Sequence, residues 1–235
     1  LVSYAGGEVS GCYNGGNISY YAESAEGLAD GGVQRTGVAG IAAYIGWSGK
    51  EVQNNINDGN ITFRAGYSSG YAASGSFTKY AVNVAGVFAA VYNCGLNGCK
   101  NSGEINFTMT DIDNASSYDY KAVNNPARQS CGGVVASSWG KLTDCENTGD
   151  VNIIFTTVKP QAGVTLSGWN GKKVGYQFGG ISGGDYHSSQ DKSPIEGCTN
   201  SGDIHIISNA TAYNNNAGGI VGWPAKGGAT IDIAN

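Results

Sequence analysis

The chain has 235 residues, of which 13% are charged and 40% hydrophobic, with 39 glycines and four prolines. This low charge and high apolar content argue against a disordered chain, and no run of 18 apolar residues is present to span a membrane. The net charge of −5 and only three arginines, far apart in the sequence, disfavour binding to nucleic acid, which normally needs a basic patch.

A ten-residue motif recurs along the chain, starting at Val9, Val52, Leu96, Leu142 and Ile195. It reads aliphatic, two variable residues, Cys or Asn, any residue, Asn, any residue, Gly, a polar residue, then Ile or Val. Its fourth slot falls at residues 12, 55, 99, 145 and 198, so successive copies are 43, 44, 46 and 53 residues apart. A second signature lies between the copies, reading VAGIAA at 38, VAGVFA at 84, CGGVVA at 131, FGGISG at 178 and AGGIVG at 217. Five copies of two motifs in a fixed order predict a repeat protein.

The segment that closes each motif alternates between apolar and polar residues, which is the period of a half-buried strand. The apolar positions are Ile18, Ile61, Ile105, Val151 and Ile204, and the polar positions that follow them are Ser19, Thr62, Asn106, Asn152 and His205. The Gly-Gly-Ile segment and the segment around the Cys slot add two more strands per unit. We therefore predict an all-β fold, a parallel β-solenoid of about five coils of roughly 43–53 residues, with three short strands per coil plus long side loops.

Two slots of the motif predict stacked ladders along the solenoid. Gly16, Gly59, Gly103, Gly149 and Gly202 are expected at one bend, where positive φ or close backbone approach favours glycine. Asn14, Asn57, Asn101, Asn147 and Asn200 are expected to bond to turn backbone or to each other.

Both termini resemble interrupted strands. Residues 1–3 match the tail of a Gly-Gly-Ile strand, and residues 230–235 match the start of the ten-residue motif. We expect residues 1–235 to be one continuous β-solenoid segment, cut inside a repeat at both ends. Such ends should pair with flanking repeats or with copies of the chain itself, end to end, in an array or filament.

The six cysteines have two interpretations. Cys12, Cys99, Cys145 and Cys198 share the fourth slot and predict a structural, mostly reduced ladder, because an inward cysteine behaves as a small hydrophobe. Cys94 and Cys131 lie outside that slot and are the best candidates for a disulfide.

Catalytic and metal-binding constellations are weak. Glu104, Asp150 and Asp203 occupy one slot and could share Ca²⁺, but a solvated acidic edge is the favoured interpretation. Asp185, His187 and Ser188 are adjacent in sequence, which is not triad geometry. We predict no catalytic residue, no metal and no cofactor.

Aromatic residues and sequons form two further patterns. Trp47, Tyr92, Trp139, Tyr186 and Trp223 follow the Gly-Gly pairs at similar distances and predict an aromatic column, which either stabilises neighbouring coils or, if exposed, offers flat faces to a sugar or partner. Candidate glycosylation sequons start at Asn17, Asn60, Asn106, Asn114 and Asn209.

The Gly-Gly-Ile strand followed by aliphatic-x-x-Cys-x-x-x-Gly-x-Ile resembles the GLUG-type repeats of bacterial cell-surface and adhesin-like proteins. The family commonly has Cys-Tyr-Ala-Thr-Gly where this chain has Cys-x-Asn-x-Gly, and only Cys12-Tyr13 keeps the aromatic. The resemblance implies a secreted or cell-surface β-solenoid and carries over no catalytic residues. We expect a non-enzymatic extracellular structural or adhesive segment; the alternative is a carbohydrate-binding or carbohydrate-cleaving β-helix.

Overall fold

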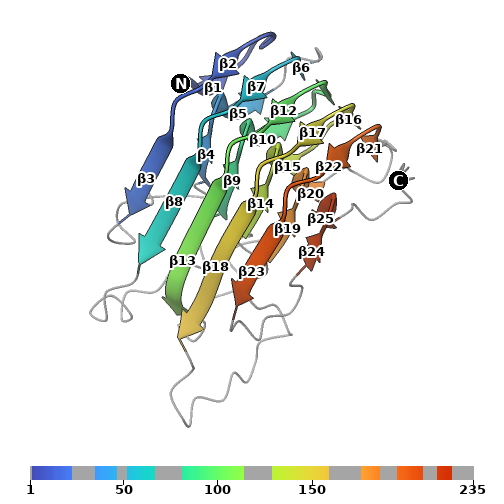
Figure 1. The fold of residues 1–235 in the computed structure, drawn as a ribbon. Helices are drawn as coiled ribbons and strands as arrows, with labels where there is room; N and C mark the ends of the chain where they lie inside the picture. Colours follow the sequence, from blue (N-terminus) through green and yellow to red (C-terminus); the bar gives the residue numbers. More distant parts are fainter. Residues whose placement is uncertain are drawn as a thin grey trace, which may run out of the picture.

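The computed structural model describes residues 2–22, 35–46, 52–66, 81–113, 129–158, 176–185, 195–208 and 216–223. These residues form strands β1 to β25 and no helix. Every strand pairing is parallel, and partners come from neighbouring coils, so the chain is a parallel β-solenoid, as predicted (Figure 1). In the described part of the chain there is consequently no helix that could cross a membrane.

Five sheets run along the stack, named A to E here. Sheet A contains β1 (Val2–Ala5), β5 (Ala42–Gly46), β10 (Phe88–Tyr92), β15 (Val135–Ser138), β20 (Ser182–Asp185) and β25 (Val221–Trp223). Sheet B contains β6 (Val52–Gln53), β11 (Leu96–Asn97), β16 (Leu142–Thr143) and β21 (Ile195–Glu196). Sheet C contains β2 (Tyr13–Asn14), β7 (Ile56–Asn57), β12 (Lys100–Asn101), β17 (Glu146–Asn147) and β22 (Thr199–Asn200).

The two remaining sheets carry the longer strands and the Gly-Gly signature. Sheet D contains β3 (Ile18–Ala22), β8 (Ile61–Gly66), β13 (Ile105–Asp113), β18 (Val151–Val158) and β23 (Ile204–Ser208). Sheet E contains β4 (Arg35–Ala39), β9 (Ala81–Ala85), β14 (Gln129–Gly132), β19 (Tyr176–Gly179) and β24 (Asn216–Gly218).

A complete coil therefore has five strands, where three were predicted, because two of the predicted strands are bent. The Gly-Gly segment bends at its second glycine into a sheet E strand and a sheet A strand. The motif bends at its third slot, between sheets B and C. That slot has positive φ in every copy, at Gly11, Asn54, Gly98, Asp144 and Gly197. Only Gly, Asn and Asp occur there, and these residues tolerate the left-handed conformation best. Sequence reasoning treated the slot as variable and missed this signal.

The glycine that recurs in the eighth slot of the motif is required for a different reason. Its φ is not positive in any copy, but a Cβ on Gly103 would lie 2.1 Å from the carbonyl oxygen of Gly59. Gly59, Gly149 and Gly202 approach the coil below in the same way. Close backbone approach, one of the two reasons predicted for this ladder, is the one that applies.

The interior consists of two apolar clusters. One lies between sheets D and E and holds stacked rings: Tyr20 on Phe63 at 5.6 Å and Phe63 on Phe107 at 5.5 Å between centroids. The other lies between sheets A and B and is mainly aliphatic, with Cys94, Cys99, Cys145 and Cys198. The apolar row of sheet D is buried as predicted at Ile61, Ile105 and Val151 and half-buried at Ile18 and Ile204.

The asparagine ladder is present and runs through all five coils. The Nδ2 atoms of Asn14, Asn57, Asn101 and Asn147 each donate to the Oδ1 of the next asparagine, at 2.7 Å in all four cases. Each Nδ2 also donates to the carbonyl two residues ahead, for example from Asn101 to Gly103 at 2.8 Å. Both amide hydrogens are thus bonded, which is what burial of an amide requires.

Candidate functional site

Sheet D contains the longest strands that the structure describes, β13 and β18, and these two lie side by side (Figure 1). Side chains alternate across the sheet, so every second residue points outward. The strand register aligns these residues into two rows that cross all five coils. The polar row is Ser19, Thr62, Asn106, Asn152 and His205, and the mixed row is Tyr21, Arg64, Thr108, Ile154 and Ile207. The polar row is exposed or half-buried, as predicted.

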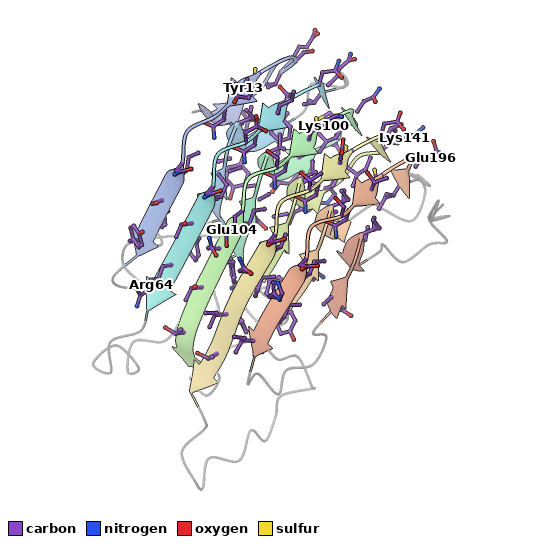
Figure 2. The ribbon with its side chains drawn as sticks, in the orientation of Figure 1. Tyr13, Arg64, Lys100, Glu104, Lys141 and Glu196 are labelled. Carbon is purple, nitrogen blue, oxygen red and sulfur yellow. The ribbon has the colours of Figure 1, made fainter. Side chains whose placement is uncertain are left out.

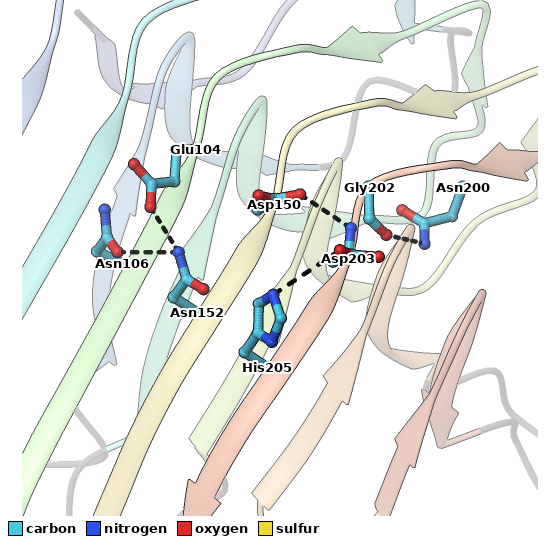
Figure 3. A network of polar contacts seen from close by, with 8 residues as sticks. All are labelled: Glu104, Asn106, Asp150, Asn152, Asn200, Gly202, Asp203 and His205. Carbon is cyan, nitrogen blue, oxygen red and sulfur yellow. Dashed lines mark hydrogen bonds and ion pairs between the residues drawn. The ribbon is translucent and has the colours of Figure 1, made fainter.

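Neighbouring coils of the polar row are joined through amide and carboxylate groups (Figure 3). The Nδ2 of Asn152 donates to Glu104 Oε1 at 2.5 Å and to Asn106 Oδ1 at 3.3 Å. His205 Nε2 lies 3.9 Å from Asp203 Oδ2, and both side chains are exposed. The face therefore presents neutral hydrogen-bonding groups beside carboxylates, with hydroxyl, amide and imidazole side chains in one line.

The slot that precedes each sheet D strand carries a second ladder. Asn17 Oδ1 accepts from Asn60 N–H, Asn60 Oδ1 from Glu104 N–H, and Asp150 Oδ1 from Asp203 N–H, each at 2.9 Å. Glu104 departs from this pattern, because its carboxylate bonds to Asn152 instead.

The carboxylates of this slot, Glu104, Asp150 and Asp203, point to separate partners instead of a shared centre. Among the residues that the structure describes, no three Asp, Glu, His or Cys side chains are grouped to hold a metal ion. Of the adjacent residues Asp185, His187 and Ser188, the last two lie outside the described residues.

The mixed row exposes apolar area. Tyr21 is 62% exposed and Ile207 is 64% exposed, with Ile154 beside Ile207 on the adjacent strand. Arg64 lies next to Tyr21 and is also exposed. A flat tyrosine ring and a guanidinium among hydroxyl groups can contact an uncharged, hydroxyl-rich ligand.

Two lysine–glutamate pairs lie at or beside sheets B and C (Figure 2). Lys100 Nζ lies 2.8 Å from Glu146 Oε2, and Lys141 Nζ lies 2.8 Å from Glu196 Oε2, so each pair joins two coils. Glu146 raises the pKa of Lys100 through this bond and its charge. A hydrogen bond to the Asp58 carboxylate likewise raises the pKa of Tyr13. Exposed pairs of this kind contribute little to stability and are screened by salt.

The predicted aromatic column is visible in part. Tyr92 and Trp139 stack at 4.4 Å between centroids and are half-buried. Tyr44, which sequence reasoning did not include, continues the stack at 6.5 Å from Tyr92. Trp223 lies on β25, whereas Trp47 and Tyr186 lie outside the described residues.

The cysteine predictions had mixed outcomes. Cys99, Cys145 and Cys198 are buried on consecutive coils, as predicted, but Cys12 is exposed. The predicted bridge between Cys94 and Cys131 is wrong, because neither is in a disulfide and the two lie in different apolar clusters. Burial raises the pKa of the Cys131 thiol far above its usual range.

Three of the five sequons lie in the described part of the chain. Asn17 and Asn60 are exposed and Asn106 is half-buried, while Asn114 and Asn209 lie outside the described residues.

The chain matches no family model, no curated protein and no solved structure.

Proposed function

We propose that this chain is a non-enzymatic structural or adhesive repeat segment of an extracellular surface protein or filament. The observation that carries the proposal is the asparagine ladder, with four inter-coil bonds of 2.7 Å that join all five coils. A ladder of this kind fixes the register of each coil on the next, which is a structural role. Coils stacked in this register form an elongated array, and the outward-facing positions of the motif repeat along its length.

The resemblance to GLUG-type repeats supports an extracellular or cell-surface location, and the exposed sequons at Asn17 and Asn60 are compatible with a secreted glycoprotein. Partners would be further coils. In the described residues β1 and β25 form the two edges of sheet A, and such edges pair with another strand when one is offered. That strand would come from flanking repeats or from a second copy of the chain.

The second candidate is carbohydrate binding, and the outer face of sheet D favours it. Tyr21 presents an exposed ring beside hydroxyl, amide and imidazole groups at successive coils, about 4.8 Å apart along the stack. A linear polysaccharide laid along the solenoid axis would meet one side chain of the polar row per coil.

One experiment separates these candidates. The chain is incubated with a panel of soluble polysaccharides, and both retention in affinity electrophoresis and release of reducing ends or unsaturated products are measured. The structural proposal predicts no cleavage. Reproducible cleavage would overturn it. Retention without cleavage supports the carbohydrate-binding candidate if Tyr21→Ala abolishes it and Tyr4→Ala, which alters a tyrosine with 60% exposure in sheet A, does not.

Assembly is tested separately. Light scattering of the 235-residue chain over a range of concentrations should show growth into elongated particles. Particles of constant monomer mass at all concentrations would contradict the end-to-end partner.

A further inference from the structure

Three of the six thiols form a continuous column inside the solenoid. Cys99, Cys145 and Cys198 occupy the same slot on consecutive coils and point into the apolar cluster between sheets A and B. The residues that follow them pair in register, Lys100 with Glu146 and Glu146 with Thr199. Backbone bonds close beside them as well, from Glu146 N to Cys99 O at 3.0 Å and from Thr199 N to Cys145 O at 2.9 Å.

This register sets the distance between neighbouring cysteines. Adjacent parallel strands lie about 4.8 Å apart, and disulfides join Cα atoms that are about 4.4–6.8 Å apart. The register therefore places neighbouring Cα atoms of the column within the range of a disulfide, and closing a bond also requires the two parallel side chains to turn one sulfur toward the next coil.

The other three thiols face no sulfur on the next coil. Cys131 pairs with Val84 on one side and Phe178 on the other. The carbonyl of Cys94 packs against Gly140, and Cys12 is followed on the next coil by Asn55, whose Oδ1 accepts from its backbone N–H at 3.0 Å.

We propose that this column is an oxidation site at which a hydroperoxide closes one disulfide, between Cys145 and Cys198, and so ties the fifth coil to the fourth. Cys198 is the entry point, because it is 6% exposed while Cys99 and Cys145 are fully buried. Cys145 is the sulfur next to it, so Cys145 resolves the oxidised intermediate and Cys99 stays reduced.

The reaction balances with hydrogen peroxide as the oxidant. The Cys198 sulfur attacks one peroxide oxygen, the O–O bond breaks, and Cys198 becomes a sulfenic acid as one water leaves. The Cys145 sulfur then attacks the Cys198 sulfur, the S–O bond breaks, and a second water leaves. In sum, two thiols and one peroxide give one disulfide and two waters.

The surroundings favour this order and this product. A hydrogen bond with Cys145 lowers the pKa of Cys198 and that of Cys99 alike, and of these two thiols Cys198 is the less buried. The disulfide is neutral, so the apolar interior can hold it. The bonds given up are weak thiol contacts, from Cys145 to Thr143 O at 3.4 Å and from Cys198 to Glu196 O at 3.5 Å.

The test is peptide mapping of the full chain after native treatment with hydrogen peroxide and alkylation of the remaining thiols. We expect the intact mass to fall by two hydrogens before alkylation. We expect one linked peptide pair that contains Cys145 and Cys198 and that dithiothreitol separates. The melting temperature should rise on oxidation, and dithiothreitol should reverse the rise. Cys145→Ala should abolish the link and leave Cys198 overoxidised, whereas Cys99→Ala and Cys131→Ala should leave the link intact.

The same mapping on the wild-type protein does not depend on the folding of any variant. Complete alkylation of Cys145 and Cys198 after peroxide treatment, overoxidation of Cys198 without a link, or a link to any other cysteine would overturn it.

Discussion

The three middle coils and the two outer coils carry the same motif but differ in burial. Asn57, Asn101 and Asn147 are fully buried, whereas Asn14 and Asn200 are half-buried although they belong to the same ladder. The difference shows that the motif sets the register of a coil, while burial requires a coil on each side. Identical substitutions should therefore cost more in the middle of the stack than at its outer coils, and the following variants test that rule.

The largest effect is expected for Ile105→Asp. Ile105 is fully buried between Ile61 and Val151, so the carboxylate of an aspartate at this position would be buried among apolar side chains. The free energy of unfolding should fall by about 3–5 kcal/mol. The matched variant Ile204→Asp, in the half-buried fifth coil, should cost much less because water can reach the carboxylate. Urea denaturation of the two variants measures their free energies of unfolding. Equal losses would contradict the rule that middle coils are more sensitive than outer coils.

Asn101→Ala comes next. It removes the amide donor from Asn147 Oδ1 and Gly103 O, and it removes one of the two hydrogen bonds of Asn57 Nδ2, which keeps its bond to Gly59 O. We expect a loss of about 3 kcal/mol, since each buried unsatisfied group costs about 1–3 kcal/mol. Asn14→Ala removes bonds of the same type at a half-buried position and should cost under half as much, as measured by thermal melting. A larger loss for Asn14→Ala would contradict the account.

Gly103→Ala tests the close approach between coils. Its Cβ would meet the Gly59 carbonyl oxygen at 2.1 Å, so the coils must separate locally, at about 2 kcal/mol. Gly16→Ala is the control, because the nearest atom to its Cβ is the Asn14 side-chain oxygen at 3.7 Å. Circular dichroism melts should show a clear loss for the first variant and a negligible change for the second. Equal tolerance of alanine would mean that these coils are further apart than described.

The smallest effect is expected at Lys100. Its folded pKa is raised by Glu146, so the pair's contribution is fully present below the ordinary lysine value and is lost as pH rises through the folded pKa. Melting temperatures between roughly pH 9 and 12 should fall slightly more steeply for the wild type than for Lys100→Met. High salt should reduce the difference, because both side chains are partly exposed. A difference that salt leaves unchanged would indicate that the pair is not screened by solvent.

Much of this structure is predictable from slots in the sequence. The Asn and Gly ladders and the alternation after Ile105 depend on spacing alone, which is why the register and the parallel solenoid follow directly from the repeat. The bends at Asn54 and Asp144 also had a local signal, because only Gly, Asn and Asp occupy that slot. The surroundings of the cysteines outside the ladder had no such local signal in the sequence. Cys94 and Cys131 differ from the ladder only by position, and which neighbours face them depends on the path of the chain between repeats.

The outer face shows the same division. Alternation placed Asn106, Asn152 and His205 outward, but the Glu104 contact to Asn152 could not be predicted. It arises because glutamate is one methylene longer than the Asn or Asp found in its slot on other coils, so its carboxylate reaches past the next backbone N–H.

Side-chain amide hydrogen exchange of the ladder tests the central claim most directly. The Nδ2 hydrogens of Asn57, Asn101 and Asn147, followed by NMR after transfer to deuterated water, should exchange slowly and together, because both hydrogens of each amide are bonded inside the stack. Those of Asn14 and Asn200 should exchange markedly faster. Rapid exchange of all five amides, at the rate of a solvent-exposed asparagine, would contradict a solenoid held in register by this ladder.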